Sequence, residues 1–241
     1  MPCKPEQFDC PYQKMKADTG FLDRLYKYFT PLGTRYFNIR IHNEERIKQL
    51  NNTGFILLPK HQSGVDHILE GYLIHKNRDD YGWFMAREKL PIIERWAHRM
   101  RVYRIHRAQD LPKRKENGTL AENQPDVESG KQLRDRSYDF TTYLASKGEV
   151  AVVHIEGTRN LRKETKLTKG HVTNLLRMQE RTRTSPVYVP LDIKYAKSRR
   201  NTSPAITPRK RIDITVGETF QTNNPDEFID HLVRNVELFT S

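Results

Sequence analysis

Short apolar runs alternate with helical patterns along most of the chain. Apolar and β-branched residues predict strands at Tyr36–Ile41, Phe55–Pro59, Trp83–Ala86, Val102–Ile105, Val150–Ile155, Val187–Ile193 and Arg211–Val216. Apolar residues at helical spacing predict helices at Asp66–Lys76, Pro91–Arg99, Gln132–Ser146, Lys169–Arg177 and Pro225–Leu238. This alternation is typical of an α/β fold with a mixed, largely parallel central sheet flanked by helices.

The N-terminal segment differs from the rest. Residues 1–17 are polar, and Asp18 is suited to cap a helix that Pro31 ends. An aromatic-rich apolar stripe recurs at helical spacing at Phe21, Leu22, Leu25, Tyr26, Tyr28 and Phe29. Such an amphipathic helix either packs its stripe on the core or lies in a membrane surface, and the pattern fits both. We therefore divide the chain into residues 1–35, an arm with this helix, and residues 36–241, one α/β domain.

Two polar stretches interrupt the second region. Residues 108–131 are polar, with basic residues and prolines, and predict a long surface loop or insertion. Residues 197–210 are a second basic, proline-containing loop. Either is a solvated loop or an electrostatic patch for an acidic partner.

The charge of the chain narrows the choice of partners. Its 241 residues include 42 Lys and Arg against 30 Asp and Glu, giving a formal net charge of +12. A basic surface attracts nucleic acid, anionic lipid or phosphorylated substrates. No apolar run reaches the length of a membrane-spanning helix, and no secretory signal is evident. Cys3 and Cys10 lack the companion ligands of a zinc site, so no metal is expected. Two cysteines near one terminus do not make a disulfide framework, so a cytoplasmic setting is expected.

The strongest candidate for catalysis follows the predicted strand Phe55–Pro59. His61 lies at the end of this strand, and Asp66 begins the next helix. An imidazole there can take a proton from a hydroxyl, while a carboxylate on its other nitrogen fixes the tautomer. The alternative is structural, because Ser63 and Asp66 also fit a capping box.

A second constellation, Glu156-Gly157-Thr158-Arg159, follows the strand Val150–Ile155. Glycine allows close backbone approach to a ligand, and the arginine fork matches a phosphate. Glu156 could orient that fork or accept a hydrogen bond from a substrate hydroxyl. The alternative is a turn with a surface ion pair.

Further cations follow neighbouring strands. Arg87 and Lys89 come after Trp83–Ala86, and Arg107 comes after Val102–Ile105. Ligands of α/β sheets favour the carboxyl ends of strands, so these cations could converge on one anion. Alternatively, each is a solvated charge.

Together, these motifs resemble the PlsC-like family of glycerolipid acyltransferases over about residues 36–220. The family motif H-x-x-x-x-D matches His61 to Asp66. The central E-G-T-R of another motif is identical at residues 156–159, although Ile155 and Asn160 replace its usual proline and serine. The basic second motif is similar to residues 86–90 and 102–107, but the usual Phe-Gly between them is missing.

Two later matches follow in the same order. Lys169-Gly170 resembles the downstream lysine–glycine of the family, and Val189-Pro190-Leu191 resembles its fourth motif. The resemblance implies an O-acyltransferase domain at 36–241. It implies that a fatty acyl group moves from acyl-CoA or acyl carrier protein, as co-substrate, to a glycerol-phosphate acceptor.

The resemblance also assigns roles. His61 would be the base, with Asp66 its partner. Glu156, Gly157, Thr158 and Arg159 would bind the acceptor with Arg107, joined by Arg87 or Lys89. The acceptor it favours is 1-acylglycerol-3-phosphate, with glycerol 3-phosphate or another lysolipid as alternatives. It implies no metal and no cofactor. With the charge and the N-terminal stripe, it predicts peripheral attachment to an anionic membrane.

Two other classes fit less well. A hydrolase is disfavoured because the chain has no G-x-S-x-G elbow. A nucleic-acid-binding module is permitted by charge, but no helix-turn-helix, zinc-finger or RNA-recognition signature is present. We therefore expect no nucleic-acid partner.

Overall fold

The computed structural model describes residues 20–24, 26–28, 38–63, 65–87, 101–105, 127–157, 164–195 and 211–241. Its main strands are β1 (Asn38–His42), β2 (Phe55–Pro59), β3 (Trp83–Arg87), β4 (Val102–Ile105), β5 (Val150–Val152), β7 (Val187–Tyr195) and β8 (Arg211–Val216). The helices that flank the sheet are α2 (Glu45–Gln49), α3 (Asp66–Arg78), α5 (Val127–Ser146), α6 (Lys169–Thr182) and α7 (Pro225–Asn235). The short strands β6 (Thr165–Lys166) and β9 (Phe239–Thr240) pair separately.

The main strands form one mixed sheet in the order β1-β8-β7-β2-β5-β3-β4. Every neighbouring pair is parallel except β7 with β8. The mixed, largely parallel sheet flanked by helices is therefore confirmed. Because β2, β5 and β7 run in the same direction, their carboxyl ends lie at the same edge of the sheet. Strand β1 runs in the opposite direction and is an edge strand of the sheet, separated from β2 by β8 and β7.

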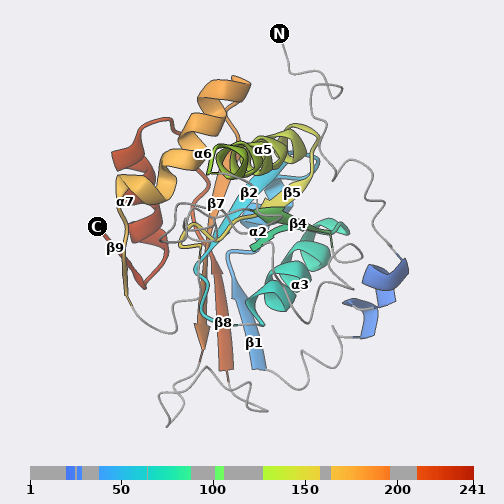
Figure 1. Ribbon diagram of the computed structural model, residues 1–241. Coiled ribbons are helices and arrows are strands. Elements are labelled where there is room, and N and C mark those ends of the chain that lie inside the picture. The colour runs from blue at the N-terminus through green and yellow to red at the C-terminus, as the bar shows by residue number, and fades with distance from the viewer. Residues whose placement is uncertain are drawn as a thin grey trace, which may run out of the picture.

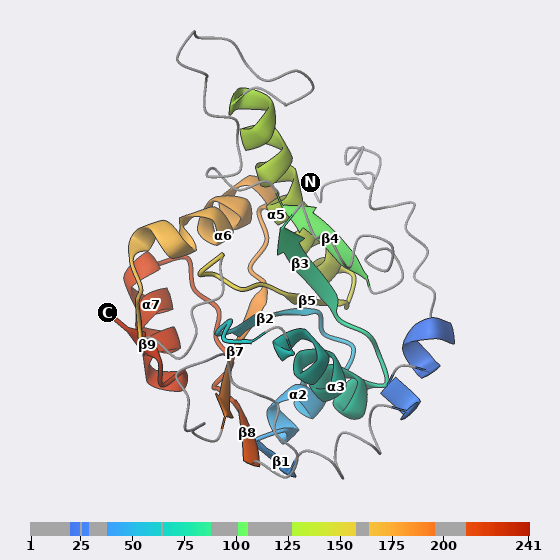
Figure 2. The same ribbon diagram turned by 60° about the horizontal axis from the view of Figure 1, so that its bottom comes forward.

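Helices cover both faces of this sheet. Helices α5, α6 and α7 lie on one side and α2 and α3 on the other, as two views show (Figures 1 and 2). Strand β2 explains the layering, since Ile56 and Leu58 belong to the core cluster on one face and Phe55 and Leu57 to the cluster on the other. A central strand buried on both faces reads as a continuous apolar run.

The described part of the N-terminal segment is helical at residues 20–24 and 26–28. Leu22 and Tyr26 are buried, and the Tyr26 ring stacks on those of His75 and Tyr81. A Cβ at Gly71 of α3 would lie 1.8 Å from the Tyr26 hydroxyl, so the two helical segments are in close contact. These contacts favour core packing of the stripe, although Tyr28 is exposed.

Some boundaries differ from the sequence expectations. Helix α5 begins at Val127, so the end of the segment predicted as a loop, 108–131, is helical. Helix α7 ends at Asn235, whose side chain bonds the His231 carbonyl and the Glu218 N–H. The predicted helix Pro91–Arg99, the arm 1–17 and the loop 197–210 lie outside the described residues. No helix among the described residues has the length and apolarity needed to cross a bilayer.

Candidate active site

The site is built at the carboxyl edge of three adjacent strands. Lys60 and His61 directly follow β2, His154 and Glu156 follow β5, and Tyr195 ends β7. The pairing of β2 with β5 and β7 aligns these ends. Side chains that are distant in sequence therefore meet beside the first turns of α3.

Asp66 connects His61 to the start of α3. Its Oδ2 accepts from His61 Nδ1 at 3.0 Å and from the backbone N–H groups of Gln62 and Ser63, both at 2.6 Å. Its Oδ1 accepts from the Tyr195 hydroxyl. The carboxylate is fully buried, whereas the His61 side chain is 15% exposed. Asp66 thus orients the imidazole and also accepts from backbone N–H groups before the helix. The N-cap of α3 is Val65, without a side-chain cap, so the predicted capping box of Ser63 and Asp66 is not formed.

The His61 imidazole is biased towards its neutral form. Burial lowers its pKa, and the neighbouring His154 and His67 lower it further, against the opposing effect of Asp66. With Nδ1 donating to Asp66, Nε2 carries the lone pair of the neutral ring. The ring is therefore suited to accept a proton at neutral pH.

Glu156 holds the backbone of His61 in place. Its Oε2 accepts from the His61 N–H at 2.8 Å, and its Oε1 accepts from Lys60 Nζ at 2.5 Å and from the Thr165 hydroxyl at 2.7 Å. The Lys60 side chain is fully buried, and that of Glu156 is 3% exposed. A buried ion pair needs such additional hydrogen bonds to offset desolvation. Both carboxylate oxygens are engaged within the protein, which favours a positioning role.

Gly157 ends this turn with a φ of 68°, in the left-handed region that favours glycine. Its N–H donates to the His154 carbonyl at 3.0 Å. The remaining predicted binding residues, Thr158, Arg159, Arg107 and Lys89, lie outside the described residues. Arg87 is the last residue of β3, but its side chain lies outside them.

The sequence did not indicate a second ionisable group beside His61. Glu70, on the second turn of α3, accepts from His154 Nε2 at 3.0 Å and bonds His67 Nδ1 at 3.3 Å. Burial alone would raise the pKa of Glu70, but the facing histidines lower it below its ordinary value. Burial also opposes protonation of His154, yet the charge and hydrogen bond of Glu70 raise its pKa.

These residues carried weak signals in the sequence. His67 and Glu70 have the i, i+3 spacing of side-chain pairs on a helix, and His154 comes just before the E-G-T-R motif. The His61 and His154 ring centroids are 4.3 Å apart. The site therefore contains two carboxylate–histidine systems in contact.

The comparisons with known proteins identify the family and a similar fold. The family model described as "Acyltransferase" matches residues 38–194, which include β1 to β7 and the His61–Asp66 pair. The fold is similar to the crystal structure of the 1-acyl-sn-glycerophosphate (LPA) acyltransferase PlsC from Thermotoga maritima. That match has a TM-score of 0.56 and 15% identity, and it covers 92% of this chain and 81% of that one. No curated protein matches the chain.

Proposed function

Because the chain belongs to the acyltransferase family, we propose that it moves a fatty acyl group from a thioester to a hydroxyl of a glycerol-phosphate acceptor. The observation that carries the proposal is the His61–Asp66 pair, with a partly exposed imidazole whose pKa is lowered. The acceptor we propose is 1-acylglycerol-3-phosphate, and the substrate in the name of the Thermotoga maritima protein supports this choice. Glycerol 3-phosphate or another lysolipid is the alternative acceptor.

The first step of the proposed reaction is attack by the acceptor. His61 Nε2 accepts the hydroxyl proton as the oxygen forms a bond to the thioester carbonyl carbon. Asp66 holds the Nδ1–H and stabilises the imidazolium that forms. No nucleophile from the protein is needed, because the substrate supplies the attacking oxygen.

The second step releases the donor. The tetrahedral intermediate collapses, the carbon–sulfur bond breaks, and the thiolate takes the proton from His61. We propose that backbone N–H groups near the two motifs stabilise the oxyanion. The base is neutral again, and the ester and the free thiol leave.

Positioning and acceptor binding are divided among other residues. We propose that Glu156 and Lys60 hold the His61 backbone, as their mutual hydrogen bonds suggest. Arg159 and Arg107 would bind the acceptor phosphate, because guanidinium groups match phosphate bidentately. Arg87 or Lys89 would join them. The donor is acyl-CoA or acyl carrier protein, with no cofactor.

The charge of the chain supports these partners and a membrane contact. An acceptor phosphate, the phosphates of CoA, an acidic carrier protein and anionic headgroups all attract a protein with net charge +12. We propose peripheral attachment to an anionic membrane surface from a cytoplasmic setting. Because Leu22 and Tyr26 are buried, basic loops would supply this contact, rather than the apolar stripe.

The test is a product analysis with a labelled acyl thioester. The purified chain is incubated with 1-acylglycerol-3-phosphate, glycerol 3-phosphate, a lysolipid with a larger headgroup, or monoacylglycerol, which lacks the phosphate. We expect an ester product with a phosphate-bearing acceptor and little with monoacylglycerol. Thioester hydrolysis without an acylated product would contradict the proposal, as would salt-sensitive retention on DNA in a chain that transfers no acyl group.

A further inference from the structure

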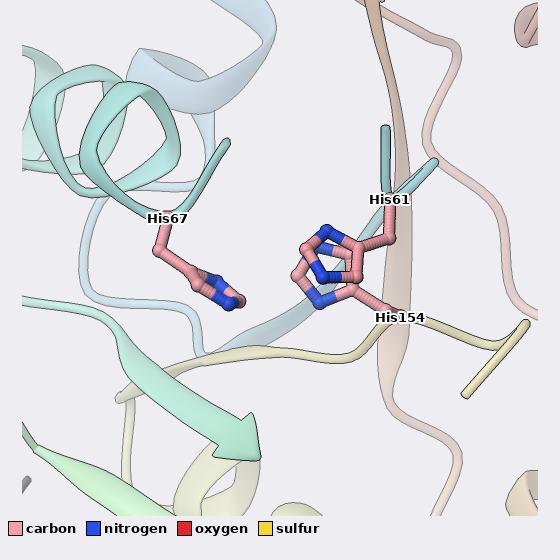
Figure 3. A group of neighbouring side chains, drawn as sticks. All are labelled: His61, His67 and His154. Carbon is pink, nitrogen blue, oxygen red and sulfur yellow. The ribbon is translucent and has the colours of Figure 1, made fainter. Parts of the chain in front are cut away.

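Three imidazoles meet where β2, α3 and β5 come together. His61 follows β2, His67 lies in the first turn of α3, and His154 follows β5 (Figure 3). One ring nitrogen of each lies within 4.8 Å of one from each of the others. In the figure, His67 points towards the other two rings. Nitrogen ligands from three separate segments are thereby concentrated at one point.

Buried carboxylates orient all three rings. His61 Nδ1 lies 3.0 Å from Asp66 Oδ2, His67 Nδ1 lies 3.3 Å from Glu70 Oε2, and His154 Nε2 lies 3.0 Å from Glu70 Oε1. Both carboxylates are fully buried. No described residue hydrogen-bonds the second nitrogen of any of these rings. Carboxylates behind histidines in this way fix the tautomer and strengthen the imidazole as a metal ligand.

We propose that His61, His67 and His154 form a binding site for a divalent transition metal ion of the Zn²⁺ class, and that the bound ion blocks acyl transfer. Imidazole suits Zn²⁺ and Co²⁺, and three protein ligands leave a fourth position for water. The blocking half rests on the proposed function, because the ion occupies the His61 lone pair that serves as the base. Metal binding and proton acceptance at that nitrogen exclude each other.

The geometry requires only a small closure. With Zn–N bonds of about 2.0–2.1 Å, the nitrogens of a tetrahedral site lie about 3.3–3.4 Å apart. The rings must therefore turn so that their ligand nitrogens, now within 4.8 Å of one another, approach by on the order of 1 Å. The His67 side chain is 30% exposed, whereas those of His61 and His154 are 15% and 7% exposed. His67 has the most room to turn towards the other two.

The binding test uses the full, untagged chain after removal of metal with EDTA and gel filtration. Co²⁺ is titrated while its visible absorption is recorded, because tetrahedral nitrogen coordination gives a distinctive spectrum, and Zn²⁺ is then added to displace it. We expect one equivalent per chain. His67→Phe and His154→Phe should lose stoichiometric binding while keeping an aromatic ring. Glu70→Gln should weaken binding by about 10–100-fold.

His42→Phe is the matched control. Its imidazole also contacts a carboxylate, with Nε2 3.2 Å from Asp213 Oδ1, but it lies on the edge strand β1, which β8 and β7 separate from β2. This variant should bind Co²⁺ as the wild type does. Circular dichroism checks that each variant is folded. If His154→Phe unfolds, the more exposed His67→Phe decides the assignment.

Activity is measured separately as the ratio of acyl transfer with and without Zn²⁺ for each variant. We expect Zn²⁺ to inhibit the wild type by at least about 10-fold, EDTA to reverse this, and the two ligand variants to lose the inhibition. No stoichiometric Co²⁺ binding by the wild type, or binding retained in both variants, would overturn the site. Zn²⁺ stimulation would overturn the blocking role. A chain that binds Co²⁺ through these histidines but transfers no acyl group would refute only the proposed function.

Discussion

Asp66 and Glu70 lie one turn apart on α3, and the surroundings of the two carboxylates can be compared directly. Both are fully buried, and each has a histidine ring nitrogen at 3.0 Å. Yet the pKa of His61, beside Asp66, is lowered, whereas the pKa of His154, beside Glu70, is raised. Two carboxylate–histidine pairs, one with aspartate and one with glutamate, therefore favour opposite protonation states within one site.

The difference follows from the groups around each imidazole, since burial and two histidines lower the pKa of His61, whereas Glu70, Asp66 and Glu156 raise that of His154. Asp66 also accepts from the Gln62 and Ser63 N–H groups and from Tyr195, so its charge is shared among several donors. Among the described residues, Glu70 hydrogen-bonds only His154 and His67, and its charge raises the pKa of His154. A cationic His154 then opposes protonation of the adjacent His61. The comparison shows that surroundings, more than the partner residue, decide which imidazole is held neutral.

The largest expected effect tests which of the two systems performs the chemistry. His61→Ala should reduce acyl transfer by about 10²–10⁴-fold, because a general base contributes this much. Turnover by the purified variant, compared with the wild type at equal folded fraction, measures it. The control is His42→Ala, which removes an imidazole on the edge strand β1, three strands away from β2. Near-normal turnover in His61→Ala would reject the mechanism.

A second effect concerns the stability supplied by the other system. Glu70→Gln should lower the free energy of unfolding by about 3 kcal/mol, the lower end of the range for a broken buried pair, because His154 can release its proton. Urea denaturation measures it. Glu45→Gln, at an exposed residue in the first turn of α2, is the control and should stay within about 0.5 kcal/mol of the wild type. An equally small change in the free energy of unfolding of both variants would show that the Glu70–His154 pair does not stabilise the fold.

The contrast between these systems also explains what the sequence could reveal. His61 and Asp66 are close in sequence, and the strand before them is apolar throughout, so their proximity was predictable. Glu70 and His154 are 84 residues apart. Their contact depends on the pairing of β2 with β5, which a local pattern does not encode. Pairs within one segment are therefore predictable, and pairs between strands are not.

The fold shows the same division between local and distant information. The strands Phe55–Pro59, Val102–Ile105 and Arg211–Val216 have the predicted bounds because their own residues give the signal. Helix α2 was missed because its five residues are too short for a periodic pattern. Strand β9 was missed because it is stabilised by pairing with distant β6.

A third effect tests the hydrogen bond between Tyr195 and Asp66. Tyr195→Phe removes the hydroxyl that donates to Asp66 Oδ1 and should destabilise the fold by about 1.5–3 kcal/mol, as for a hydrogen bond to a charged group. Thermal and urea denaturation measure it. Tyr143→Phe is the comparison variant, because Tyr143 is a half-buried residue of α5, remote from Asp66. If Tyr195→Phe has full stability, the Tyr195 hydroxyl does not support the carboxylate.

The smallest effect is the opposite pH dependence of stability that the two histidines should confer. The folded pKa of His61 is lowered, so the folded state binds fewer protons than the unfolded chain, and its contribution to stability falls as pH drops through about 6.5. The folded pKa of His154 is raised, so its contribution is complete below about 6.5 and is lost as pH rises through the folded value.

Urea denaturation of His61→Gln and His154→Gln between about pH 5 and about pH 8 separates these contributions, since an ordinary histidine titrates in this window. The stability of His61→Gln relative to the wild type should rise as the pH falls, because the variant lacks the imidazole that resists protonation in the folded state. His154→Gln should be most destabilising at low pH, where its pairing with Glu70 is strongest. His42→Gln controls for the loss of an imidazole as such. Parallel pH curves for the two site variants would mean that both imidazoles have the same environment, and the contrast between Asp66 and Glu70 would then carry no meaning for catalysis.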